Sequence, residues 1–79
     1  MNAAEAQEVK HLLLHNNDQF RQLAEQHHQL DNRLHELSDK HYLSPNERIE
    51  EVDLKKRKLA LKDRMEAMAR DYLQGNGGS

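Results

Sequence analysis

The sequence of 79 residues contains no cysteine and no tryptophan, and it has only one proline, one phenylalanine and two tyrosines. Without cysteine, disulfide bonds are excluded, and nothing indicates an oxidising compartment. All three glycines lie in the last five residues, so there is no glycine-rich phosphate-binding loop. Apolar residues make up 35% of the chain, which predicts a thin core that gains stability by association with another chain.

Long apolar runs are also lacking, and none approaches the roughly 20 residues that a membrane-spanning helix requires. The first ten residues, MNAAEAQEVK, lack the basic start and the apolar centre of a signal peptide. We therefore expect a cytoplasmic protein that does not enter a membrane. Charged residues of both signs are interspersed and the net charge is −2, which excludes a polybasic or strongly acidic chain.

Two helices are expected before residue 42. Residues 3–15 should form the first helix and residues 18–41 the second, in which apolar positions alternate at spacings of three and four. Asparagine and aspartate at 16–18 favour a helix start, so Asn16 or Asn17 is a candidate cap for the second helix. The apolar phase nevertheless continues through this interruption, so the sequence leaves open whether the chain kinks or breaks there.

The clearest local signal is the tetrapeptide SPNE at 44–47. Its serine suits a helix cap, its proline suits the first helical position, and its glutamate suits the carboxylate of a capping box. A third helix is therefore predicted over 45–73, after a turn at 42–44. The glycine-rich residues 75–79 should end this helix as a disordered tail, which leaves a single domain over residues 1–74.

The short connection between the second and third helices predicts an all-α fold, an antiparallel two-helix hairpin that packs like a coiled coil. With a tight turn, the numbers of facing residues sum to about 86. This register places Phe20 against Met65 and Met68, and Leu37 against Ile49. The side chains expected along the hairpin core are Phe20, Leu23, His27, Leu30, Leu34, Leu37, Leu54, Leu61, Met65 and Met68.

The third helix is apolar on two sides. Ile49, Val52 and Leu59 lie roughly opposite the hairpin core when the helix is projected at about 100° per residue. A helix with two apolar faces needs two neighbours, so these three residues are the candidate dimer or partner face. We expect a homodimer in which two hairpins form a four-helix bundle, and docking of a helix from another protein is the alternative.

Two motifs carry a family resemblance, HxxLD at 27–31 and LKKxKLxLKD at 54–63. With them, residues 9–73 of the chain resemble the YdcH-like proteins, small bacterial helical hairpins that are classed as a domain of unknown function. The resemblance implies the hairpin fold and brings no established activity. Those proteins usually have Asn-Pro two residues before the phenylalanine, whereas Asn17 is followed here by Asp18, which again raises the question of a helix break.

The six histidines suggest chemistry only weakly. His27 lies on the hairpin core with Asp31 one turn later, and we expect a partly buried histidine held by this carboxylate; a pH-sensitive or catalytic histidine is the alternative. His11 and His15 are one turn apart, as are Asp31 and His35, but two ligands do not make a zinc site. We therefore predict no metal, no cofactor and no catalytic residue.

The block from Lys55 to Arg64 contains six lysines and arginines and one aspartate. On a helix these charges are distributed around the cylinder, with Lys55, Lys58 and Lys62 in one stripe beside the core. Asp31 lies near this stripe in the expected register, so these four residues should form a charge network. Nucleic-acid binding by the block is the alternative, although no aromatic side chain lies within it to stack on bases.

The sequence also lacks a nucleophile elbow, paired catalytic acids and a cysteine site. We expect a small non-enzymatic protein that acts through self-association or through contacts with another helical protein. The nucleic-acid-associated protein described above remains the alternative function.

Overall fold

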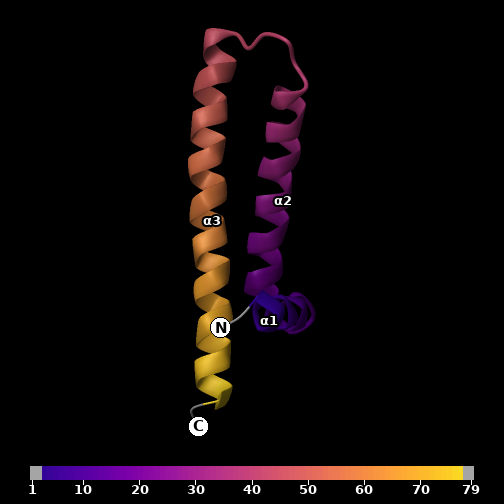
Figure 1. Ribbon diagram of the computed structural model, residues 1–79, viewed down its shortest axis with the longest axis vertical. Helices are drawn as coiled ribbons and strands as arrows, with labels where there is room; N and C mark the ends of the chain where they lie inside the picture. The colour runs from indigo at the N-terminus through magenta and orange to yellow at the C-terminus, as the bar shows by residue number, and fades with distance from the viewer. Residues whose placement is uncertain (1–2, 78–79) are drawn as a thin grey trace.

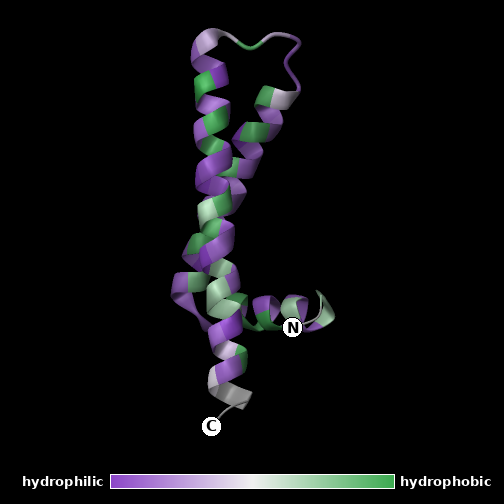
Figure 2. Ribbon diagram, turned by 60° about the vertical axis from the view of Figure 1, so that its left-hand side comes forward, coloured by the Kyte–Doolittle hydropathy of each residue, from purple (hydrophilic) through white to green (hydrophobic). Residues whose placement is uncertain are grey.

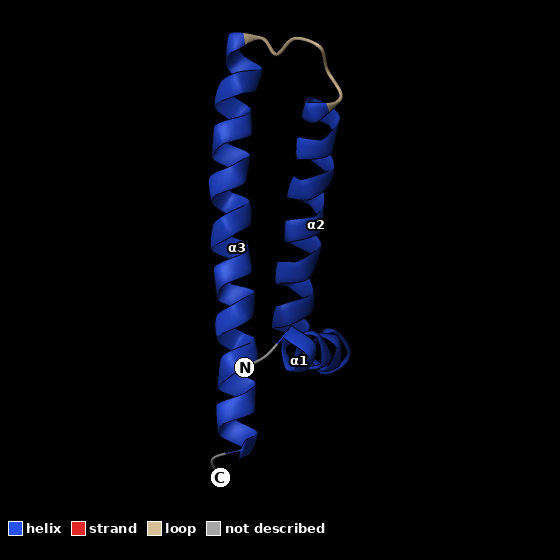
Figure 3. Cartoon of the chain, in the orientation of Figure 1, coloured by secondary structure: helices blue, strands red, loops and turns tan. Residues whose placement is uncertain are grey.

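The computed structural model describes residues 3–77, and within this range all regular secondary structure is α-helical (Figure 3). The helices are α1 (Ala3–Asn16), α2 (Asp18–Ser38) and α3 (Pro45–Gly77), so the predicted all-α class is confirmed with three helices. α2 and α3 lie side by side in opposite directions, while α1 lies crosswise at the end remote from the connecting loop (Figure 1). The molecule is elongated, with extents of 52 × 20 × 19 Å. None of the described helices is long and apolar enough to cross a membrane.

The helix is interrupted at Asn17, where α1 ends and α2 begins. The sequence left open whether the chain kinks or breaks its helix at this point, and the structure shows a full break. Asn17 has an extended backbone (φ −132°, ψ 112°), and its Oδ1 accepts a hydrogen bond from the Phe20 N–H at 2.9 Å. The guanidinium of Arg21 donates to the carbonyl oxygens of Leu14 and His15 at the end of α1, at 3.2 and 2.9 Å. The cap therefore starts α2 in a new direction, and Arg21 fixes the end of α1 beside it.

α2 ends at Ser38, three residues before the predicted end at residue 41, and the connection to α3 spans 39–44 instead of 42–44. The Asp39 N–H donates to the carbonyl oxygen of His35 at 3.2 Å, and the Ser38 hydroxyl donates to the same oxygen at 2.8 Å. The Ser38 hydroxyl competes for the carbonyl oxygen that accepts the last helical hydrogen bond, and apolar spacing does not record such a bond. This explains why the helix was predicted too long.

α3 begins with the predicted capping box. The Ser44 N–H donates to Glu47 Oε1 at 2.9 Å, and the Glu47 N–H donates to Ser44 Oγ at 3.1 Å. Pro45 occupies the first helical position, where its missing N–H costs no hydrogen bond. The start of α3 is thus fixed by local residues alone.

The other end of α3 differs from the prediction. The helix continues through Gly77, four residues beyond the predicted end at 73, so residues 75–77 are helical and do not belong to a disordered tail. No described glycine has a positive φ, and the left-handed stop that glycine usually provides is therefore not used. The last two residues of the predicted tail, 78 and 79, lie outside the described residues.

The largest buried cluster lies where α1 meets α2 and α3, and we call this end of the molecule the foot. Its members are Val9 and Leu13 from α1, Phe20 from α2 and Ala69 from α3, each at most 4% exposed. Four partly buried side chains pack against them, namely Met65, Met68, Tyr72 and Leu73. Three helices converge here, so the side chains between them are enclosed.

Between the foot and the loop, only α2 and α3 meet, and we call this region the two-helix part. Leu23, Leu37 and Leu54 are buried there, and other apolar residues are partly or largely exposed. Figure 2 shows apolar residues as green patches that alternate with polar residues along both helices. Two helices touch along a strip, so neither can cover the margins of the other.

Candidate interaction surfaces

The ten side chains predicted for the hairpin core differ in burial. Four are buried, and these are Phe20, Leu23, Leu37 and Leu54. Six are partly buried, and these are His27, Leu30, Leu34, Leu61, Met65 and Met68. Met65 and Met68 pack against the cluster that contains Phe20, as the register predicted.

One pairing in that register is wrong. Leu37 is 1% exposed and was expected to face Ile49, but Ile49 is 68% exposed. A side chain that lies mainly in solvent cannot cover a fully buried leucine. Ile49 instead belongs to the opposite side of α3, where its position on the helical projection also places it.

The contribution of α1 to the core was missed. Val9 and Leu13 are each 4% exposed and pack with Phe20 and Ala69, whereas Leu12 is 45% exposed. The spacing of four between Val9 and Leu13 was an available signal, but it does not say which helix they contact. Lys10 of α1 also approaches Glu66 of α3, with 3.8 Å between Nζ and Oε1.

Arg33 forms the best-defined bridge between α2 and α3. Its Nε and Nη2 donate to the two carboxylate oxygens of Glu50 at 2.8 and 2.9 Å, and its Nη1 donates to Glu36 at 3.0 Å. These hydrogen bonds raise the pKa of Arg33, and the bond from Arg33 lowers the pKa of Glu50. Sequence reasoning did not single out this pair, because its two members are ordinary surface residues until the register is known.

The predicted charge network is present only in part. Lys58 donates to the Asp31 carboxylate across the two helices, and this hydrogen bond is the main reason why the pKa of Asp31 is lowered. Lys55 instead pairs with Glu51 on its own helix, with 3.9 Å between Nζ and Oε1. Lys62 lies along the same side of α3 and lines the groove described below.

At the loop end of the molecule, an ion pair joins the connecting loop to α3. Lys40 donates to Glu47, the same residue that closes the capping box of α3. The lysine and the Ser44 N–H together lower the pKa of Glu47 from 4.5 to about 2. Glu47 therefore couples the start of α3 to both ends of the connecting loop, through Lys40 and Ser44.

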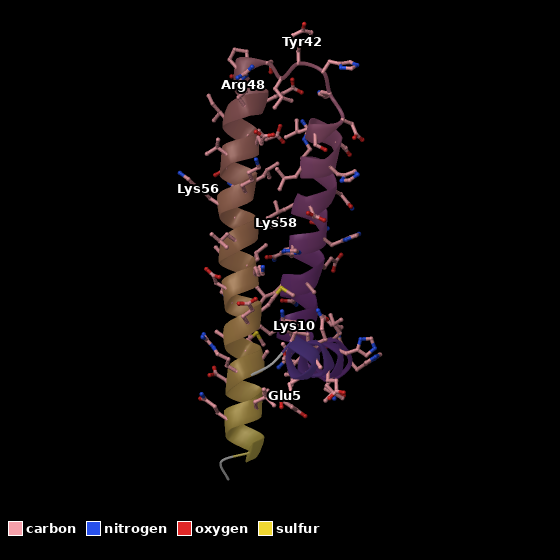
Figure 4. The ribbon with its side chains drawn as sticks, in the orientation of Figure 1. Glu5, Lys10, Tyr42, Arg48, Lys56 and Lys58 are labelled. Carbon is pink, nitrogen blue, oxygen red and sulfur yellow. The ribbon has the colours of Figure 1, made fainter. Side chains whose placement is uncertain are left out.

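The outer face of α3, opposite α2, exposes large apolar side chains. Ile49, Val52 and Leu59 are 68%, 53% and 59% exposed. Lys56 lies on the same side and projects away from α2, whereas Lys58 projects towards it (Figure 4). The three residues predicted as a dimer or partner face thus lie accessible along one side of the helix.

A shallow groove runs between α2 and α3 on one flank of the hairpin. Charged side chains of both signs line it together with Leu34, and Leu59, which is 59% exposed, also contributes to its lining. Its charged side chains are Asp31, Glu51, Lys55, Lys58 and Lys62, which leaves a formal charge of +1. The basic stripe is thus largely balanced by its own neighbours.

The histidines remain scattered. His27 is partly buried one turn before Asp31, and its charge adds to the lowering of the Asp31 pKa. The rings of His11 and His15 pack edge to face with centroids 5.4 Å apart. Among residues 3–77, no three histidine, cysteine or acidic side chains converge in a way that could hold a metal ion.

The profile of one protein family matches residues 20–69, and this family is described as a protein of unknown function (DUF465). The matched region contains α2 from Phe20 onwards, the connecting loop and α3 as far as Ala69, and it excludes α1. Comparison with curated proteins and comparison with solved structures both gave no match.

Proposed function

We propose that this chain, which belongs to the DUF465 family of proteins of unknown function, is a cytoplasmic, non-enzymatic module that acts through helix-mediated association. In this proposal the antiparallel hairpin of α2 and α3 is the associating unit. Two copies join through the outer faces of α3 and form a four-helix bundle. The observation that carries the proposal is the exposure of Ile49, Val52 and Leu59 on one side of α3.

The thin core supports this proposal. Most apolar side chains in the two-helix part are partly buried or exposed, so a second hairpin can supply the neighbour that a single hairpin lacks. Burial of the three outer residues would contribute roughly 1.5 to 3 kcal/mol for each side chain before the costs of association are subtracted. Because each copy contributes the same three residues, the gain is doubled by symmetry.

Nucleic-acid binding is supported less well. Lys58 is engaged by Asp31, Lys55 lies beside Glu51, and Arg57 forms an ion pair with Asp53, with 3.0 Å between Nε and Oδ2. A phosphate backbone would have to compete with these carboxylates, and the net charge of −2 opposes its approach. The basic block therefore supports ion pairing within the protein better than it supports a phosphate-binding surface.

Sedimentation equilibrium over a wide concentration range tests the proposal. We expect the wild-type chain to dimerise and Leu59→Glu to be monomeric at the same concentrations, since the substitution places a carboxylate in the apolar contact. Leu12→Glu is the matched control, because Leu12 is also an exposed leucine but lies on α1. A wild-type chain that stays monomeric, or a Leu59→Glu chain that dimerises as tightly as wild type, would contradict the proposal.

A further inference from the structure

We infer that the second copy lies antiparallel on the outer face of α3, in a register where the numbers of facing residues sum to about 119. In this arrangement, Lys56 of each copy faces Asp63 of the other. The inference rests on the proposed self-association and specifies its geometry. It follows from the spacing, size and charge of the residues along this face.

Six residues between positions 52 and 67 form one stripe along the outer face of α3. Between positions 52 and 67, the residues within about 100° of one another on this side of the helix follow in steps of four, three, one, three and four. They are Val52, Lys56, Leu59, Ala60, Asp63 and Ala67. In an antiparallel pair with a twofold axis between residues 59 and 60, each residue lies level with the one that is equally far on the other side of the axis.

The side chains brought together by this axis are complementary in size. Val52 lies level with Ala67, so a larger side chain meets a small one on each side of the axis, while the two Leu59 side chains lie beside each other at the axis. Such alternation allows two helices to approach closely without voids. Ile49 lies beyond these pairs and faces Arg70, whose methylene groups provide an apolar surface.

The charges on the face are complementary only in the antiparallel arrangement. Lys56 and Asp63 lie symmetrically about the centre between Leu59 and Ala60, so twofold symmetry produces two identical opposite-charge pairs. A parallel pair of helices would place Lys56 against Lys56 and Asp63 against Asp63, which is unfavourable. The pattern of charge therefore selects the direction of the second copy.

Both charged residues are available for this role. Within residues 3–77, neither Lys56 nor Asp63 takes part in an ion pair, although Lys55, Arg57 and Lys58 beside them all do. Figure 4 shows Lys56 pointing outwards from α3, away from the hairpin core. The outer face thus keeps one cation and one anion unengaged at symmetric positions.

The cysteine-free chain allows a direct test by disulfide cross-linking. Val52→Cys and Ala67→Cys chains are each oxidised alone and then as a mixture, and the products are identified by mass spectrometry. We expect mixed disulfides in the mixture and little cross-linking in either variant alone, because residues 52 and 67 face each other across the axis. Sedimentation of the reduced variants and their helical content by circular dichroism establish that both are folded dimers.

The outcomes separate this inference from the proposed function. Cross-linking of each variant with itself, without mixed disulfides, in chains that still dimerise would overturn the antiparallel register and leave self-association intact. A wild-type chain that is monomeric would overturn both. Dimers in which neither single variants nor the mixture cross-link would overturn the register as well.

Charge exchange gives an independent test. Lys56→Asp and Asp63→Lys each turn both reciprocal pairs into like-charge pairs, and we expect dimerisation to weaken about tenfold for each variant. The double variant and an equimolar mixture of the two single variants restore opposite charges and should recover wild-type affinity. Single variants that dimerise as tightly as wild type would overturn the assigned register.

Discussion

The foot and the two-helix part contain similar side chains but bury them differently. At the foot, three helices enclose Val9, Leu13 and Phe20, each at most 4% exposed. In the two-helix part, Leu30 and Leu34 occupy equivalent positions of the predicted core and are only partly buried. A hairpin alone therefore does not supply enough neighbours to bury its own apolar residues. α1 supplies the additional neighbouring helix, and it does so only at the foot.

The two regions also differ in how their helices are joined at the margins. In the two-helix part, Arg33 bridges to Glu50 and Lys58 bridges to Asp31 across the open edges of the hairpin. Such exposed pairs set the register of the helices more than they add stability. Apolar packing at the foot should therefore dominate the free energy of unfolding.

The largest expected effect compares the two regions with one type of substitution. Leu13→Ala removes a side chain from the enclosed foot and should lower the free energy of unfolding by about 2–5 kcal/mol. Leu30→Ala removes the same atoms from a partly exposed position and should cost clearly less. Urea denaturation followed by circular dichroism measures both, and equal costs would mean that the foot is not the more tightly packed region.

A smaller effect is expected at the junction between the foot and α2. Asn17→Ala removes the acceptor of the Phe20 N–H and should lower the free energy of unfolding by about 1 kcal/mol. Asn17→Asp keeps an acceptor at the same place and should retain most of the stability. Thermal unfolding distinguishes the two variants, and an Asn17→Ala chain as stable as wild type would show that the break does not depend on the cap.

The smallest effect at neutral pH is expected at the loop end of the two-helix part. Because the pKa of Glu47 is lowered from 4.5 to about 2 in the folded chain, its contribution to stability is complete above pH 4.5 and is lost as the pH falls towards 2. Glu47→Gln keeps a hydrogen-bond acceptor but should be less stable than wild type at pH 7 and equally stable near pH 2. Thermal unfolding between these pH values measures the difference.

Lys40→Gln provides the matched variant for this measurement. It removes the main cause of the lowered Glu47 pKa and should reduce the acid dependence in the same direction. A difference between wild type and Glu47→Gln that stays constant from pH 7 to pH 2 would show that the charge of Glu47 does not support the capping box.

A helix start that depends on neighbours in the sequence was predictable, and so was one contact between α2 and α3. Ser44 and Glu47 form the capping box that the tetrapeptide SPNE indicates, and the cross-helix bond between Lys58 and Asp31 followed from the expected register. The end of α2 was misplaced because local hydrogen bonds of Ser38 compete with the helix and leave no trace in the apolar spacing. The tail was misjudged because glycine permits a helical backbone as well as a stop.

The sequence by itself determined the all-α class, the start of α3 and the two apolar faces of that helix, because caps and helical periodicity are local properties of the chain. Only the tertiary structure decided that α1 turns crosswise at Asn17 and packs Val9 and Leu13 against Phe20 and Ala69. The physical reason is that apolar spacing identifies which side of a helix is to be buried but does not specify the partner. Which helix covers that side depends on the direction that the chain takes after the cap at Asn17. It also depends on which distant segments come together in the fold.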